Sequence, residues 1–266
     1  MLGTRRPHLV IGLTTYNYEM LRISVPAIAR IRDAFVLIVH NDNPNIKLTK
    51  KNFRDLGYRG PIHIINSDTS VGTMAARFQI ARAASQIENA DWITYVDDDD
   101  ILTSIKIPNI STDNFIIIKN AIIIRHQLLD VLRAMDNPHA ISPDGENITL
   151  LRPNVGIVGN PIRTAVMCAV ADIVDKIHPM LDDIFGKIPN RMPTDLIMWE
   201  FINTWAHNIP NAPHPIYMDE VSYIANKIDT PTNKYGKRTI APRGGFGRMI
   251  TNAVAGFAAA MVADEQ

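Results

Sequence analysis

Cysteine is almost absent from this chain of 266 residues, which contains only Cys168. A single cysteine excludes an intramolecular disulfide, and such scarcity is typical of proteins in a reducing compartment. Cys168 lies within an apolar run, residues 166–170, so we interpret it as a core residue rather than a catalytic thiol. No disulfide framework therefore constrains the fold.

Long apolar runs and an excess of one charge are also missing. No run of about 18 uninterrupted apolar residues occurs, so a membrane-spanning helix is not expected. Residues 1–7 lack the apolar segment that a secretory signal peptide requires. The formal net charge is +0, which leaves no global basic field to collect nucleic acid. We therefore expect a cytoplasmic globular protein, with peripheral contact with a membrane left open.

Against this neutral background, the four acids Asp97 to Asp100 directly follow a short apolar run, residues 90–96. Such a run predicts a buried strand of a parallel sheet. Adjacent carboxylates repel one another unless a cation or a set of donors lies between them. Carboxylate oxygens suit Mg²⁺ or Mn²⁺, usually shared with the phosphates of a ligand. The pattern indicates a divalent-metal site for a phosphorylated ligand; an exposed acidic turn is the alternative.

Strand and helix patterns alternate along the first hundred residues. Strands are expected at residues 9–13, 35–40, 62–65 and 90–96, and helices at 19–32, 47–56 and 73–87. This alternation is typical of a parallel sheet with helices on both faces. The turn residues Asn17, Asp42 and Asp68 follow strands, as the acid cluster does. Because the carboxyl ends of parallel strands meet at one crevice, we expect these side chains to converge on one site.

The second half of the chain is less regular. Residues 115–124 favour two strands or a hairpin about Lys119 and Asn120. The remaining expectations are a helix at 126–135, strand material at 154–160 and 164–171, a short helix at 172–184, a helix at 196–207 capped by Thr194 and Asp195, a strand at 214–223 and a polar segment at 229–238. An amphipathic helix at 246–263 is expected to pack on the domain or on a second subunit.

Four segments in this order resemble the family 2 glycosyltransferases, which have the GT-A fold. They are residues 10–17 (VIGLTTYN), 36–42 (VLIVHND), 66–77 and 95–100 (YVDDDD). The resemblance is clear over residues 8–102 and fainter over 155–225. Two departures are Asn41-Asp42-Asn43-Pro44, where the family usually has two Asp, Gly and Ser, and Phe78, where the family usually has Asn.

The resemblance implies a GT-A (Rossmann-like) α/β fold with a mostly parallel central sheet, helices on both faces, a smaller acceptor-side region and a C-terminal helix. It divides the chain into a single domain, residues 1–240, and a helical tail, residues 241–266. Within the domain, residues 8–102 would form the nucleotide-sugar half and residues 103–240 the acceptor half.

The family's activity implies transfer of a sugar, with inversion, from a nucleoside-diphosphate sugar, most often a UDP-sugar, to a hydroxyl acceptor. The acceptor stays open among a glycan, a lipid-linked molecule, a protein and a modified nucleic acid. Asp99 would bind Mn²⁺ or Mg²⁺ on the diphosphate. The expected donor-binding residues are Thr15 and Asn17 beside the base, Asp42 at the nucleoside, Asp97 at the ribose or uracil, Asp98, and Arg77. For Arg77, a contact with the diphosphate competes with a pair to an acid on its own helix.

Inversion requires a base that deprotonates the acceptor hydroxyl. In this family the base is an Asp at the start of a late helix, and residues 191–199 resemble that segment, with Thr194 in place of the usual Glu. Asp195 is therefore the candidate base, and a helix-capping Asp is the alternative interpretation. We interpret Trp199 as a core residue. His207 and His214 are considered as further metal ligands, although a lone histidine is more often structural.

Three other functions compete with this one. A nucleotidyltransferase would have a Gly-rich stretch with Arg and Lys after the first strand, but Gly12 stands alone there. A phosphoesterase would need further His or Asp ligands, and His40 is the only ready candidate. A non-catalytic nucleotide-sugar-binding domain would keep the fold without transfer. Two further hypotheses are that residues 229–238 close over the donor as a lid, and that the terminal helix joins two subunits.

Overall fold

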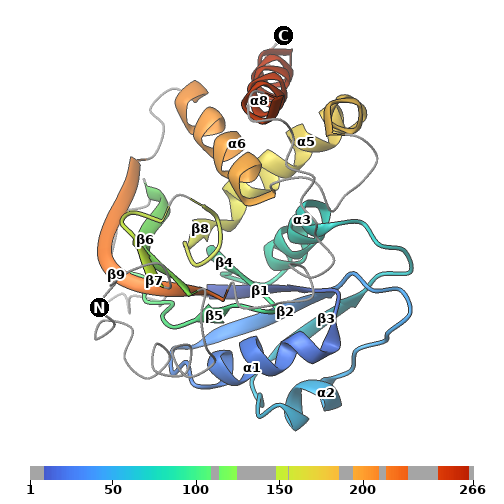
Figure 1. Ribbon diagram of the computed structural model, residues 1–266, viewed down its shortest axis with the longest axis vertical. Helices are drawn as coiled ribbons and strands as arrows, with labels where there is room; N and C mark the ends of the chain where they lie inside the picture. Colours follow the sequence, from blue (N-terminus) through green and yellow to red (C-terminus); the bar gives the residue numbers. More distant parts are fainter. Residues whose placement is uncertain are drawn as a thin grey trace.

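The computed structural model describes residues 9–108, 114–124, 148–154, 156–185, 194–209, 214–226 and 245–263. Within these ranges, the strands form one sheet in the order β3-β2-β1-β4-β8-β6-β9-β5, and β7 pairs with β6 off this path. Helices lie on both sides of the central strands (Figure 1). The predicted α/β fold class, with a mostly parallel central sheet, is confirmed.

The parallel half of the sheet consists of β1 (Leu9–Thr15), β2 (Phe35–Asn41), β3 (Ile62–Asn66) and β4 (Trp92–Asp97). β1 pairs in parallel with β2 and with β4, and β2 pairs in parallel with β3. Every residue of β1 is buried, which explains why its sequence is apolar on both faces. The four strands confirm the predictions made from the apolar runs.

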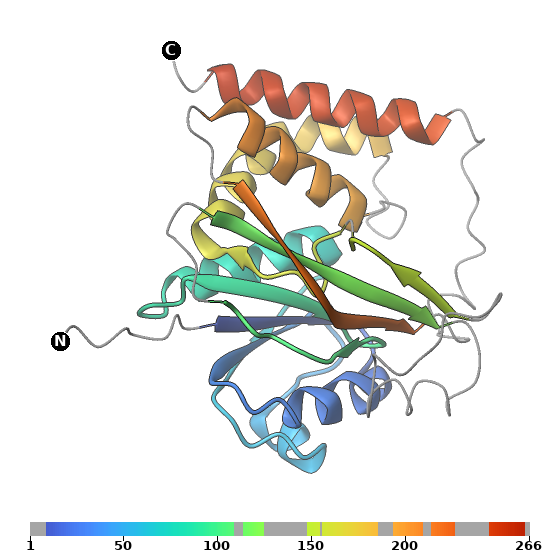
Figure 2. The same cartoon turned by 90° about the vertical axis from the view of Figure 1, so that its left-hand side faces the viewer.

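The helices expected between these strands are also confirmed, with shorter bounds: η1 (Tyr18–Met20) and α1 (Leu21–Ala29), α2 (Lys50–Asp55), and α3 (Thr73–Ser85). α1 and α2 lie on one face of the sheet and α3 lies on the other (Figures 1 and 2). α3 approaches β1 closely at Gly12. A Cβ atom at Gly12 would lie 2.9 Å from Ile80 Cγ2 and 2.9 Å from Tyr95 Cδ1, so the contact requires glycine.

The other half of the sheet is mixed, and comprises β5 (Ile101–Leu102), β6 (Asn114–Ile124), β7 (Ile148–Leu151), β8 (Ile162–Arg163) and β9 (His214–Asn226). β8 pairs antiparallel with both β4 and β6, so it joins the two halves. β6 and β9 run parallel, and β5 pairs antiparallel with β9. The strand expected at residues 214–223 is confirmed as β9.

The prediction of two strands or a hairpin about Lys119 and Asn120 is wrong, because β6 continues through both residues. Lys119 Nζ lies 3.3 Å from Glu220 Oε2, and Asn120 donates a hydrogen bond to Asp219 Oδ1 at 2.7 Å. Both acids belong to β9, so the neighbouring strand supplies partners for the polar pair inside the sheet. A register shift between Ile118 and Asn120 accompanies this contact.

Three further helices lie on the α3 side of the sheet: α5 (Thr164–Phe185), α6 (Thr194–Asn208) and α8 (Gly245–Ala263) (Figure 2). The prediction of strand material at residues 164–171 is wrong, because α5 begins at Thr164. Val166, Met167, Val170 and Ala171 are buried at helical spacing, but a short apolar run such as residues 165–171 does not by itself distinguish a buried helix from a strand. Of the predicted strand material at 154–160, the described residues 154 and 156–160 form no strand apart from one bridge between Val158 and Tyr95.

The helices expected at residues 196–207 and 246–263 are confirmed as α6 and α8. α8 packs on the domain, with Phe257 stacked on Phe201 of α6 at 4.6 Å between ring centroids. No helix of the described ranges is long and apolar enough to cross a membrane. The helix predicted at 126–135 and the lid predicted at 229–238 fall outside the described residues.

Candidate active site

The carboxyl ends of the parallel strands meet at one edge of the sheet. Thr14 lies opposite Asp97 in the strand pairing, and Thr15 lies opposite Asn41. Thr14 Oγ1 donates a hydrogen bond to Asp97 Oδ1 at 3.3 Å, and Thr15 Oγ1 donates one to Asp98 Oδ2 at 2.6 Å. Polar groups of β1 and of the acid cluster therefore meet at this edge, whereas the expected convergence of the Asn17, Asp42 and Asp68 side chains is not tested by these contacts and stays a prediction.

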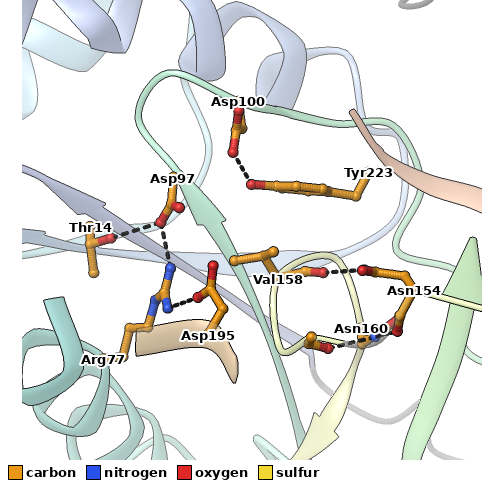
Figure 3. Close-up of polar contacts among 10 residues, drawn as sticks. Thr14, Arg77, Asp97, Asp100, Asn154, Val158, Asn160, Asp195 and Tyr223 are labelled. Atoms are coloured by element: carbon orange, nitrogen blue, oxygen red, sulfur yellow. Dashed lines mark hydrogen bonds and ion pairs between the residues drawn. The ribbon is translucent and has the colours of Figure 1, made fainter. Parts of the chain in front are cut away.

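Arg77 of α3 lies against these strand ends and is fully buried. Its Nη2 donates to Asp97 Oδ1 at 2.6 Å, and its Nη1 donates to Asp195 Oδ1 (Figure 3). Burial alone would lower the pKa of Arg77, but the two carboxylates raise it above its ordinary value, so the guanidinium stays charged. The Tyr95 hydroxyl donates to the Arg77 carbonyl at 3.0 Å. One buried cation thus joins β4 to α6.

The prediction that Arg77 pairs with an acid on its own helix is wrong. Both of its carboxylate partners belong to other elements, and they approach from the end of β4 and from the start of α6. The competing prediction, a contact with the donor diphosphate, is not tested by these contacts and stays a prediction.

Asp97, at the end of β4, and Asp98 and Asp100, in the turn that follows, each accept a hydrogen bond from a side chain of another element. The pairs are Asp97 with Arg77, Asp98 with Thr15, and Asp100 with Tyr223. Asp100 and Tyr223 are both buried, at 1% and 2% exposure. Repulsion within the acid cluster is therefore relieved partly by donors from the protein itself.

Protonation relieves a further part of this repulsion. The pKa of Asp98 is raised to about 7: burial is the largest cause, the Thr15 hydroxyl opposes it, and the carboxylates of Asp99 and Asp97 add to it. A cation placed near this carboxylate would favour its ionised form. The turn is therefore a place where a positive ligand is accommodated readily near neutral pH.

Asp99, the predicted metal ligand, lies in the same turn and is partly exposed. Among the residues that the structure describes, no group of three or more His, Cys, Asp or Glu side chains is arranged to hold a metal ion. Mg²⁺ does not require such a group, because it is usually bound by one or two carboxylates together with phosphate oxygens and water. The carboxylate oxygens of this turn fit a metal site shared with a ligand.

Asn17 and Asp42, the predicted nucleoside contacts, both have hydrogen bonds within the protein. Asn17 Oδ1 accepts from the Glu19 amide at 3.1 Å and begins η1. The carboxylate of Asp42 accepts from the segment that leads into α3, namely from the Ser70 hydroxyl at 2.7 Å and from the amides of Val71 and Gly72 at 2.7 and 3.0 Å. These bonds stabilise loops beside the site, and a nucleoside contact stays a prediction for both residues.

Asp195 lies in the first turn of α6, which begins at Thr194. Its side chain is 43% exposed although one oxygen accepts from Arg77. A negative charge at this place also interacts favourably with the helix dipole. Neither sequence interpretation of Asp195, as the base or as a helix cap, includes this contact with Arg77. Trp199, further along α6, is buried in the core as interpreted.

The histidines considered as ligands do not join this cluster. His207 is exposed near the other end of α6, where its Nδ1 hydrogen-bonds to the Asn203 carbonyl at 2.7 Å. His214 is exposed at the first residue of β9. His40 is fully buried at the end of β2. None of the three belongs to a metal-binding group within the described ranges.

Sequence reasoning missed three residues of the site: Thr14, Tyr95 and Tyr223. Thr14 has a local signal, because it lies in the same polar strand end as Thr15. The two tyrosines have none, since their hydroxyl partners are the Arg77 carbonyl and Asp100, which are distant in the sequence. Only the fold brings these groups together.

No family model matches the chain, and no curated protein matches it. Similar solved structures include S. aureus TarS 1-349, with a TM-score of 0.47 and 14% sequence identity. Another is S. aureus TarS, with a TM-score of 0.45 and 14% sequence identity. Each of these two similarities covers 82% of this chain. The chain spans 60% and 36% of those two chains. A third is the mannosyltransferase PcManGT from Pyrobaculum calidifontis in complex with GDP-Man and Mn²⁺, with a TM-score of 0.45 and 12% sequence identity. This similarity covers 98% of this chain and 75% of the mannosyltransferase chain. Similarities at this level establish no shared activity.

Proposed function

We propose that this chain is a metal-dependent inverting glycosyltransferase, which moves a sugar from a nucleoside-diphosphate sugar to a hydroxyl acceptor. One observation carries the proposal: the buried guanidinium of Arg77 contacts both Asp97 and Asp195. Asp97 is the carboxylate expected on the donor side, and Asp195 is the expected base. Two acids to which the resemblance assigns complementary roles contact the same side chain, and this supports the proposal.

Asp195 is suited to accept a proton. Its Oδ1 is held by Arg77, and Figure 3 draws a contact to only this one of its two carboxylate oxygens. In the proposed reaction this carboxylate takes the proton of the acceptor hydroxyl while the acceptor oxygen forms a bond to the anomeric carbon. The bond from that carbon to the donor's phosphate oxygen breaks, and its electron pair remains on the phosphate. Attack opposite the leaving group inverts the anomeric centre.

The turn after β4 would hold the donor. Asp99 would bind Mn²⁺ or Mg²⁺ together with diphosphate oxygens, and Asp97 and Asp98 would lie beside the nucleoside. The cation, when bound, takes up the negative charge that develops on the leaving diphosphate. The Thr15 hydroxyl donates to Asp98 Oδ2 at 2.6 Å and so orients this carboxylate within the site.

Calorimetric titration tests the donor site. UDP and GDP are titrated into the protein with Mn²⁺ and then with EDTA, because no described contact selects a base. Binding is expected only with the metal, and Asp99→Asn is expected to abolish it. The control is Asp55→Asn on α2, which removes an exposed acid paired with Lys51 and should bind like the unaltered protein. Absence of nucleotide binding under all conditions would refute the proposal.

Activity assays with UDP- and GDP-sugars test the chemistry. Asp195→Asn is expected to bind nucleotide normally but to lose transfer, or hydrolysis of the donor, by about 100-fold or more. A protein that binds nucleotide with metal, yet shows no transfer or hydrolysis in either form, would instead be a non-catalytic nucleotide-sugar-binding domain.

A further inference from the structure

Tyr223 of β9 holds Asp100, the last residue of the turn formed by Asp97 to Asp100, which we call the acid turn. Its hydroxyl donates a hydrogen bond to Asp100 Oδ2, and both side chains are buried (Figure 3). Burial, followed by the nearby carboxylate of Asp100, raises the pKa of Tyr223 well above its ordinary value, so the hydroxyl keeps its proton. The Asp100 carboxylate therefore faces a permanent donor from a strand 123 residues further along the chain.

The same part of β9 also holds the residues that follow the turn. Leu102 of β5 lies opposite Tyr223, and Ile101 lies opposite Ile224. The Thr103 amide donates to the Ser222 carbonyl at 2.9 Å. The turn itself is closed by the Asp100 amide, which donates to the Asp97 carbonyl at 3.2 Å. The acid turn is thus attached to the parallel sheet through β4 at one end and to β9 at the other.

Gly159 packs closely against Tyr223. It has a φ of +75°, and a Cβ atom there would lie 2.4 Å from Tyr223 Cβ. Its amide donates to the Tyr95 carbonyl of β4 at 2.9 Å, and its carbonyl accepts from the Ser222 hydroxyl at 2.8 Å. The backbone of this glycine therefore joins β4, through the Tyr95 carbonyl, to β9, through the Ser222 side chain, beside the turn.

We propose that Tyr223 is a positioning residue of the donor site, which holds Asp100 so that Asp99 faces the metal on the diphosphate and Asp97 and Asp98 face the nucleoside. The inference rests on the proposed function. It assigns a role to Tyr223 and Asp100 that neither the acid motif nor the strand pattern indicates. In this proposal Asp100 anchors the turn, and the metal is bound by Asp99.

The test compares Tyr223→Phe with Tyr58→Phe. Each variant removes one buried tyrosine hydroxyl, since Tyr58 is 3% exposed and donates to the Pro61 carbonyl at 2.9 Å, on the opposite edge of the sheet. UDP and GDP are titrated calorimetrically over a series of Mn²⁺ concentrations. Tyr223→Phe is expected to weaken the apparent Mn²⁺ affinity at saturating nucleotide about tenfold, and Tyr58→Phe to change it less than about twofold. Unchanged affinity in Tyr223→Phe, or an equal loss in both variants, would overturn the inference.

A second pair of variants keeps the test decisive if Tyr223→Phe does not fold. Asp100→Asn keeps an acceptor for the tyrosine, whereas Asp100→Ala removes it. The asparagine variant is expected to retain Mn²⁺ affinity within about threefold and the alanine variant to lose about tenfold. An equal loss in both would show that the charge of Asp100 itself binds the metal, which overturns the anchoring role. If the unaltered protein binds no nucleotide with metal, the proposed function fails first and this inference with it.

Discussion

Arg77 and Asp195 form an ion pair although they lie 118 positions apart in the sequence. The same guanidinium donates to Asp97, so α3 connects β4 to α6 through one side chain. The relative position of the proposed base and the proposed donor site therefore depends on Arg77. A lysine does not reproduce this arrangement, because an ammonium group lacks the planar fork that reaches two carboxylates at once.

Arg77→Lys is accordingly expected to reduce sugar transfer about 100-fold, because the base is displaced by a fraction of an ångström or more. Nucleotide affinity should fall less than about tenfold, since the acid turn keeps its other anchors. Steady-state kinetics and calorimetry separate the two effects. The control is Arg82→Lys on the same helix, whose exposed guanidinium also pairs with two acids, Asp172 and Asp175. Transfer by Arg77→Lys at the rate of this control would contradict the positioning role.

Gly12→Ala tests whether the glycine within β1 has a structural role. The added methyl group would overlap Ile80 and Tyr95, so the free energy of unfolding is expected to fall by about 1–3 kcal/mol. Gly156→Ala is the control, because its Cβ would meet only Asn154 Oδ1, at 3.6 Å. Urea denaturation measures both. Lost nucleotide binding at unchanged stability would show instead that Gly12 approaches a ligand.

Much of the site was predictable because its signals are local. A run such as Leu9–Thr15 is apolar on both faces only in a buried parallel strand, and parallel strands carry their polar ends to one edge. Thr15, Asp97 and Asp98 therefore lie together as expected. The architecture of the first hundred residues follows from the same pattern.

The remaining features depend on distant partners. Lys119 and Asn120 have the composition of a turn, yet Glu220 and Asp219 of β9 give them partners inside a strand. No rule of spacing indicates these pairs, because they exist only after β6 and β9 have come together. The two carboxylate partners of Arg77 are hidden from the sequence for the same reason.

His40 is expected to make stability depend on pH. Burial lowers the pKa of His40, against smaller opposing effects of Gln79 and Asp42. The unfolded chain, with an ordinary pKa of 6.5, therefore takes up a proton before the folded chain does. Stability should fall as the pH drops below about 6.5, by at most about 1.4 kcal/mol per pH unit. Urea denaturation at about pH 7.5 and 5.5 should show a smaller loss in His40→Gln than in the unaltered protein; equal losses would contradict the prediction.

Asp98 is expected to have a different pH dependence. Burial raises its pKa from an ordinary value of 3.8 to about 7. Between these values the folded chain holds a proton that the unfolded chain has released. The stabilising contribution of this linkage is therefore complete at low pH and is lost as the pH rises through about 7. Above that, the folded chain contains a half-buried charge that disfavours folding.

Asp98→Asn is expected to stabilise the metal-free protein at pH 8 by roughly 1–3 kcal/mol, measured by urea denaturation in EDTA. The amide oxygen can still accept the Thr15 hydrogen bond, but no charge is buried. The same variant should bind UDP and Mn²⁺ more weakly, because the proposed donor site loses a carboxylate. Asp55→Asn, at an exposed acid, should neither stabilise the protein at pH 8 nor weaken the binding of UDP and Mn²⁺. A gain in stability with unchanged binding would remove Asp98 from the donor site, whereas no gain at pH 8 would show that its charge is not buried in the folded chain.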